Sequence, residues 1–427
     1  MAHRRFRSTT VSPSSLRASS TRVAIGLGFY GVASYVFLAV TARALGPASY
    51  ADFAVFWGIL YGIGIGVFLP FEQEVSRRVA ETRLETNDAA PILRSALRLG
   101  AVFVLALAVV LAIAIPFLNP GGYGDGVALW CVCVSGFLAL GTAYITRGAM
   151  AGQRRFDRYA VQFGVEGAAR LLGCLALLIL AVKSPWPYAL VVSGAIFLAL
   201  AVAGRPMRST ATKSTPQPVD LMKALTAVII SSVVAQSLVN FGPVVVRLLS
   251  EPSDQAVAGR FMAAALIARA PLLLFAAVQA VLIPHLVEAV VRRDRAGFTS
   301  SLRRVLLSTV CLALFGVAIC AAAGPELLRS LIGPDFELPR LDVVLLAIAM
   351  GLYLVTLVLQ PAAISLRRHR SAAVLWLGAG LVFVVACLAP LSPVRAVELA
   401  LIGSFATAVL GLVSIIACAV PRSFVTR

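Results

Sequence analysis

Apolar stretches of about 20 residues recur along the whole chain, with short polar segments between them. A run of this length forms a helix that spans the hydrocarbon core of a bilayer. Hydropathy predicts twelve such spans, at residues 23–42, 51–71, 97–118, 127–146, 160–182, 187–204, 222–246, 257–283, 304–323, 341–364, 372–390 and 396–420. The pattern therefore predicts an all-α integral membrane protein.

Most of the 37 lysines and arginines fall in alternate segments between these spans. They lie before the first span, after every even-numbered span and at the C-terminus. Because positive charge is retained on the cytoplasmic side of a membrane, this pattern predicts that both termini are cytoplasmic.

The polar, proline-containing segment 205–221 divides the spans into two blocks of six. The expected organisation is a basic cytoplasmic N-terminus at 1–22, an N-lobe at 23–204, a cytoplasmic linker at 205–221, a C-lobe at 222–420 and a cytoplasmic C-terminus at 421–427. An even number of spans in each block means that a repeat would follow a pseudo-two-fold axis along the membrane normal.

Composition excludes several classes of function. The 427 residues are 60% hydrophobic and only 13% charged, which is unlike a soluble protein. The net charge of +18 lies between apolar runs rather than on a soluble face, so no nucleic-acid partner is expected. The sequence contains no HExxH, paired-histidine or P-loop pattern, and all seven cysteines fall inside predicted spans. We expect no metal, no cofactor and no catalytic residues.

Charged residues inside the spans are the candidates for function, because each costs about 2.5–3.5 kcal/mol to insert. Glu166 and Arg170 are four residues apart, so they share a helix face and form either a structural ion pair or part of a cavity. Arg269 lies near the midplane without such an acid, and Pro271 should break its helix. We expect Arg269 to line a central cavity, whereas Arg260 lies near the outer end of the same span.

Neutral amides extend this set of candidates. Gln236 and Asn240 are four residues apart and share a face of the seventh span, and Gln279 lies further along the eighth. Such amides either bond neighbouring helices or line a polar cavity. Most such amides bond neighbouring helices, and the hypothesis set beside this is that they line the cavity together with Arg269.

Four stretches carry a resemblance to a known family. They are Arg43-Ala-Leu-Gly-Pro-Ala-Ser-Tyr-Ala-Asp-Phe with the charged run 72–80, the segment 147–160 with Glu166 and Arg170 beyond it, the segment 259–284, and Pro325–Pro334. This sequence resembles the Wzx-type polysaccharide flippases of the multidrug/oligosaccharidyl-lipid/polysaccharide exporter superfamily.

The resemblance implies a transporter that moves a lipid-linked (polyprenyl-pyrophosphate) oligosaccharide from the cytoplasmic to the outer leaflet by alternating access. Its partners would be this substrate, membrane lipid and enzymes of glycan synthesis, and its location the bacterial plasma membrane. The candidate cavity residues are Arg269, Arg170, Glu166, Arg260, Arg43, Gln236, Asn240 and Gln279.

Two alternatives stay open. One is a MATE-like cation-coupled drug exporter, for which we would expect a lone buried acid rather than arginines. The other is a polytopic glycosyltransferase that uses polyprenyl-phosphate sugars, for which we would expect an external carboxylate, as base or metal ligand, and often a large external loop. The arginines favour a phosphate-bearing substrate, because a guanidinium binds phosphate through two parallel hydrogen bonds.

Overall fold

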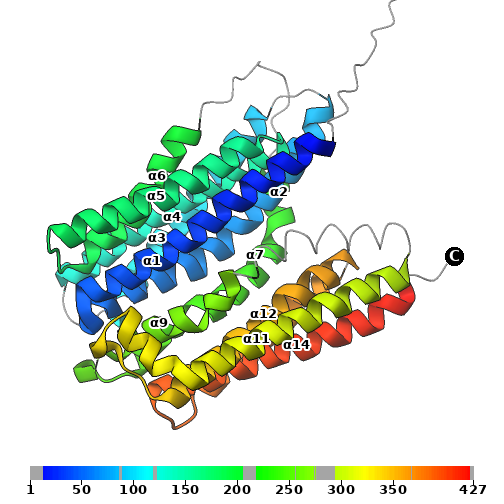
Figure 1. The fold of residues 1–427 in the computed structure, drawn as a ribbon. Coiled ribbons are helices and arrows are strands. Elements are labelled where there is room, and N and C mark those ends of the chain that lie inside the picture. The colour runs from blue at the N-terminus through cyan, green and yellow to red at the C-terminus, as the bar shows by residue number, and fades with distance from the viewer. Residues whose placement is uncertain are drawn as a thin grey trace, which may run out of the picture.

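The computed structural model describes residues 13–85, 89–118, 123–204, 218–254, 256–273, 275, 294–366 and 368–423. Within these ranges the chain is almost wholly helical and contains no strand. The helices form two bundles, one from the N-terminal and one from the C-terminal half of the chain (Figure 1). The predicted all-α membrane fold with two lobes is therefore confirmed.

The N-lobe contains the first six helices, in which α1 packs against α5, α2 against α4 and α5 against α6. Its elements are α1 (Pro13–Ile59), the π-helix η1 (Leu60–Gly64), α2 (Ile65–Glu85), α3 (Ala90–Leu118), α4 (Tyr123–Gly152), α5 (Phe156–Ile179) and α6 (Pro185–Ala203).

The element α1 contains a sharp reversal of the chain. Gly46 has φ of 73°, a left-handed conformation that glycine adopts freely, and Pro47 follows it. The rings of Phe37 and Phe53, on either side of this point, have centroids 5.9 Å apart. A straight helix would separate these residues by about 24 Å. The element therefore holds the first predicted pass and the start of the second, which continues through η1 into α2.

The C-lobe contains the remaining helices, in which α11 packs against α12, and α14 packs against both α12 and α13. Its elements are α7 (Pro218–Asn240), α8 (Gly242–Leu249), the 3₁₀ turn η2 (Pro252–Asp254), α9 (Ala256–Ala268), α11 (Arg295–Leu331), the 3₁₀ turn η3 (Pro334–Phe336), α12 (Arg340–Ser365), α13 (His369–Cys387) and α14 (Pro393–Ser423).

Where the structure describes them, the predicted spans lie mainly on helices, but the helices of the fifth and eleventh spans end at Ile179 and Cys387, short of the predicted ends at 182 and 390. In these ranges nine helices are long and apolar enough to cross a membrane. The first of the nine is the reversed segment Thr21–Thr82, which contains the first two predicted spans but is counted once. The seventh span consists of α7 and α8, which meet at an angle of 66°. The eighth begins with α9 and is described only as far as Phe275. Of the predicted linker at 205–221, the structure describes only residues 218–221, at the start of α7.

The two ends of the molecule differ in charge and in how the lobes meet. We call the end that carries Arg22, Arg78, Arg158, Arg304 and Arg370 the basic end, and the other the opposite end. At the opposite end Arg247 of α8 forms an ion pair of 2.6 Å with Asp52 of α1, and Arg43 donates a hydrogen bond to the carbonyl of Ser330. The lobes are thus bonded together there.

Candidate functional site

Two cavities lie between the lobes. The central cavity has a volume of about 300 Å³, and Tyr61 and Arg269 lie in its wall on different lobes. The basic-end cavity, of about 750 Å³, adjoins it, because Gln236, Tyr353 and Leu357 line both. This second cavity extends to Arg370, whose side chain is exposed at the basic end. Together the two cavities form an elongated space between the lobes.

Arg269 lies where the helix of the eighth span is interrupted. The helix α9 ends at Ala268, and Arg269 occupies a turn two residues before Pro271, as the proline predicts. The hydroxyl of Tyr35 donates a hydrogen bond of 2.7 Å to the Arg269 carbonyl. This contact joins the N-lobe to the break in the C-lobe helix.

The guanidinium of Arg269 reaches the break in the seventh span. Its Nη2 donates a hydrogen bond to the carbonyl oxygen of Val239. In a continuous helix this carbonyl would accept from the residue four positions later, but that residue is Pro243, which has no N–H. Pro271 therefore interrupts the helix at Arg269, and Pro243 leaves the Val239 carbonyl free to accept the hydrogen bond from Arg269.

No acidic side chain among the described residues pairs with Arg269. Its Nε has no hydrogen-bond partner there either. The described residues that line the two cavities include two arginines, Arg269 and Arg370, and no Asp or Glu. The described walls of the space between the lobes therefore carry net positive charge, with hydrogen-bonding amides from Gln236 and Asn240 beside Arg269.

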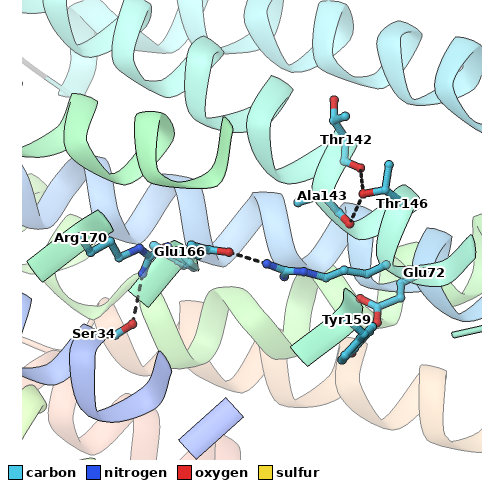
Figure 2. A network of polar contacts seen from close by, with 10 residues as sticks. Ser34, Glu72, Thr142, Ala143, Thr146, Tyr159, Glu166 and Arg170 are labelled. Atoms are coloured by element: carbon cyan, nitrogen blue, oxygen red, sulfur yellow. Dashed lines mark hydrogen bonds and ion pairs between the residues drawn. The ribbon is translucent and has the colours of Figure 1, made fainter. Parts of the chain in front are cut away.

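The N-lobe holds a second, separate group of charges. Glu166 lies between two arginines: Arg170 binds it at 2.6 Å and Arg147 binds its other oxygen (Figure 2). The side chains of Arg147, Glu166 and Arg170 are only 4%, 1% and 0% exposed. We call these three residues the arginine-glutamate trio. The pair expected from the spacing of Glu166 and Arg170 is present, inside the lobe rather than on a cavity wall.

The trio is connected to the central cavity through Tyr61 and Ser34, which both line it. Arg170 donates a hydrogen bond of 2.5 Å to the hydroxyl of Tyr61, which lines that cavity, and another of 3.2 Å to Ser34. Aromatic rings lie beside both guanidinium groups, since Phe163 is 4.0 Å from Arg147 and Tyr30 is 4.9 Å from Arg170. The trio thus orients the cavity wall without lining it.

Arg147 is the member that the apolar pattern does not reveal, because it directly follows the predicted fourth span at 127–146, in a basic segment. The helix α4 continues to Gly152 instead, so this side chain turns into the lobe. The signal was the run Ala149-Met150-Ala151, which favours continued helix beyond the apolar span.

The other candidates lie elsewhere. Arg43 bonds to the Ser330 carbonyl, and Arg260 donates a hydrogen bond of 3.3 Å to the carbonyl of Asp335, both at the opposite end. Gln279 lies outside the described residues. Of the eight candidates, the structure therefore brings Gln236, Asn240 and Arg269 together in the central cavity.

No family model matches the chain. Among curated proteins, the chain is similar to the uncharacterized protein Rv1510 of Mycobacterium tuberculosis, with 28% identity covering 88% of this chain and 86% of that protein. It is also similar to the uncharacterized protein Mb3654 of Mycobacterium bovis, with 25% identity over the same shares.

Solved structures establish the architecture. An outward-facing multidrug resistance MATE transporter of the MOP superfamily superposes with a TM-score of 0.67, at 13% identity, covering 95% of this chain and 96% of that one. The fold is that of the MATE transporters. The eukaryotic MATE transporter AtDTX14 gives 0.66 at 11% identity, covering 95% and 98%. A Pyrococcus furiosus MOP transporter, described as having a binding pocket of reverse polarity, gives 0.62 at 13% identity, covering 96% of each chain.

Proposed function

We propose that this protein is a membrane transporter that moves a lipid-linked (polyprenyl-pyrophosphate) oligosaccharide, or a related glycan precursor, to the outer leaflet of a bacterial plasma membrane. One observation carries the proposal: the charged side chains that line the cavities, among the described residues, are arginines. A MATE fold with such a cavity is suited to an anionic cargo.

The chemistry of the central cavity matches a phosphorylated sugar. A guanidinium in a site with little water binds phosphate oxygens strongly, because it presents several donors in a planar fork. The amides of Gln236 and Asn240 supply donors and acceptors for hydroxyl groups. The two cavity volumes fall in the range of small-molecule sites, so they hold a head group while the apolar tail stays in lipid.

The arrangement of the lobes supports alternating access. The lobes are bonded at the opposite end through the Asp52–Arg247 pair, and the basic-end cavity extends toward Arg370. We propose that the basic end faces the cytoplasm, that the head group enters there, and that rocking of the lobes breaks the bonds at the opposite end. A cysteine at Ser214, in an otherwise cysteine-free chain, should then resist impermeant reagents applied to intact cells; labelling from outside would contradict this orientation.

A second candidate is a MATE-like cation-coupled drug exporter. The observation in its favour is the fold, which this chain shares with multidrug MATE transporters over 95% of its length. The positive charge of Arg269 opposes it, because a cationic drug in the cavity would be repelled. The two functions therefore make opposite predictions about the charge of the cargo.

Reconstitution separates the two. The purified protein would be placed in liposomes with a fluorescent polyprenyl-pyrophosphate N-acetylglucosamine, with and without a membrane potential, and its exposure to an impermeant bleaching agent followed. The wild type should increase the bleached share, whereas Arg269→Gln should not. Arg303→Gln, at the basic end but outside both interlobe cavities, is the matched control and should behave as wild type. Transport of ethidium but not of the lipid would overturn the proposal.

A further inference from the structure

The N-lobe wall of the central cavity is aromatic. Trp57 and Tyr61 are four residues apart and lie on one face of the second pass, with ring centroids 4.2 Å apart and ring planes inclined by 36°. Both side chains line the central cavity. Tyr61 belongs to the π-helical segment η1, a rare geometry that occurs frequently at functional sites.

Neighbouring residues hold these two rings in place. Phe37 stacks on Trp57 at 6.5 Å, and Phe53 contacts it at 5.9 Å. The Tyr61 hydroxyl is held by the hydrogen bond from Arg170, so the arginine-glutamate trio fixes the ring. A surface whose side chains are already fixed loses little conformational entropy when a ligand binds it.

The C-lobe wall has the complementary chemistry. It presents the Arg269 guanidinium and the amides of Gln236 and Asn240. A ligand that satisfies both walls needs an anionic group, hydroxyl edges and a flat apolar face. A pyranose ring next to a phosphate has all three, because its axial C–H groups form apolar faces and its hydroxyls lie around the edge.

We propose that Trp57 and Tyr61 form a stacking platform for the sugar ring adjoining the phosphate, with that phosphate at Arg269. This inference rests on the proposed function and specifies which part of the cargo each wall recognises. A bare prenyl chain cannot form hydrogen bonds with the amides of Gln236 and Asn240. A flat aromatic cation would stack equally well on the rings, but Arg269 repels it.

Two probes that differ only in the sugar test the platform. Binding of farnesyl diphosphate and of farnesyl-diphospho-N-acetylglucosamine would be measured on the full chain in nanodiscs. Trp57→Leu should weaken the sugar-bearing probe about two- to tenfold, the range expected for one aromatic contact, and leave the sugar-free probe unchanged. Arg269→Gln should weaken both probes. Trp57→Phe should retain much of the sugar preference, and it covers the case in which the leucine variant fails to fold.

A matched control is Trp130→Leu, since Trp130 belongs to α4 and lines neither cavity. It should bind both probes as wild type does. Equal weakening of both probes by Trp57→Leu would overturn the platform, and so would a wild type that binds both probes equally. If the wild type binds neither probe, the proposed function is wrong, and so is the stacking platform that rests on it.

Discussion

The buried arginines of the arginine-glutamate trio in the N-lobe and Arg269 in the C-lobe have different partners. In the N-lobe, Arg147 and Arg170 share the carboxylate of Glu166 and are almost fully buried. In the C-lobe, Arg269 has a backbone carbonyl as its partner and lies in a cavity wall. Burying a charge is expensive at both sites, but only the site around Glu166 offsets the cost with an opposite charge among the described residues. The C-lobe charge, which has no counterion in the described part of the chain, is therefore available to a ligand.

The largest effect on stability is expected for Glu166→Gln, which leaves two buried arginines without their shared acid. Breaking a buried ion pair in this way costs about 3–5 kcal/mol, so the variant should lose most of its folded yield. Melting temperature in detergent and membrane abundance measure this. Asp157→Asn on the same helix removes an exposed acid and should cost at most about 1 kcal/mol. A Glu166→Gln protein with wild-type stability would show that the two buried arginines do not need the shared carboxylate.

Arg269→Gln should lower transport rather than stability. Removing the guanidinium relieves an insertion cost of about 2.5–3.5 kcal/mol, so abundance should be preserved. Transport of the lipid-linked glycan should fall about tenfold to hundredfold, because a charge-assisted hydrogen bond to the cargo is lost. Arg269→Lys should keep part of the activity, since the charge remains without the planar fork. Both quantities are measured in a strain lacking the native protein. If Arg269→Gln were less abundant but transported normally per molecule, the hydrogen bond from Arg269 to Val239 would have a purely structural role.

A smaller effect is expected at the opposite end. Arg247→Ala removes the ion pair with Asp52 that joins the lobes there, and it should favour the open arrangement by about 1 kcal/mol, or about fivefold in population. Accessibility of a cysteine placed at Tyr50 measures the change, and exchanging the two charges (Asp52→Arg with Arg247→Asp) should restore closure. Unchanged accessibility in Arg247→Ala would show that the pair does not hold the lobes together.

The smallest effect is expected for Arg260→Gln. Among the described residues, this side chain donates a hydrogen bond only to the carbonyl of Asp335, within its own lobe and away from both cavities. Its removal should change stability by less than about 0.5 kcal/mol and leave transport at the wild-type rate. If Arg260→Gln lowered transport as much as Arg269→Gln does, we would infer that the binding site extends to the opposite end.

Much of this architecture could be predicted from the sequence. The long apolar runs determine the helices, and the spacing of Glu166 and Arg170 predicts that they share a helix face, where the ion pair, one of the two alternatives, is present. The predicted break beside Arg269 is also present, because the effect of Pro271 on its own helix is local.

The long-range contacts could not be predicted in this way. Nothing local indicates that Arg147 reaches Glu166 on the next helix, or that Pro243 frees the carbonyl to which Arg269 binds. The aromatic wall had a local signal, the four-residue spacing of Trp57 and Tyr61, but this spacing alone does not distinguish a cavity wall from a packed core.

The proposed function requires that the charge of Arg269 selects the class of cargo. Its most direct test is equilibrium binding of farnesyl diphosphate and of the cation tetraphenylphosphonium to the wild type and to Arg269→Glu, both in nanodiscs. We expect that the wild type binds the diphosphate and rejects the cation, and that Arg269→Glu loses the diphosphate and gains the cation. A wild type that prefers tetraphenylphosphonium, or an Arg269→Glu protein that still binds the diphosphate with unchanged affinity, would contradict this expectation.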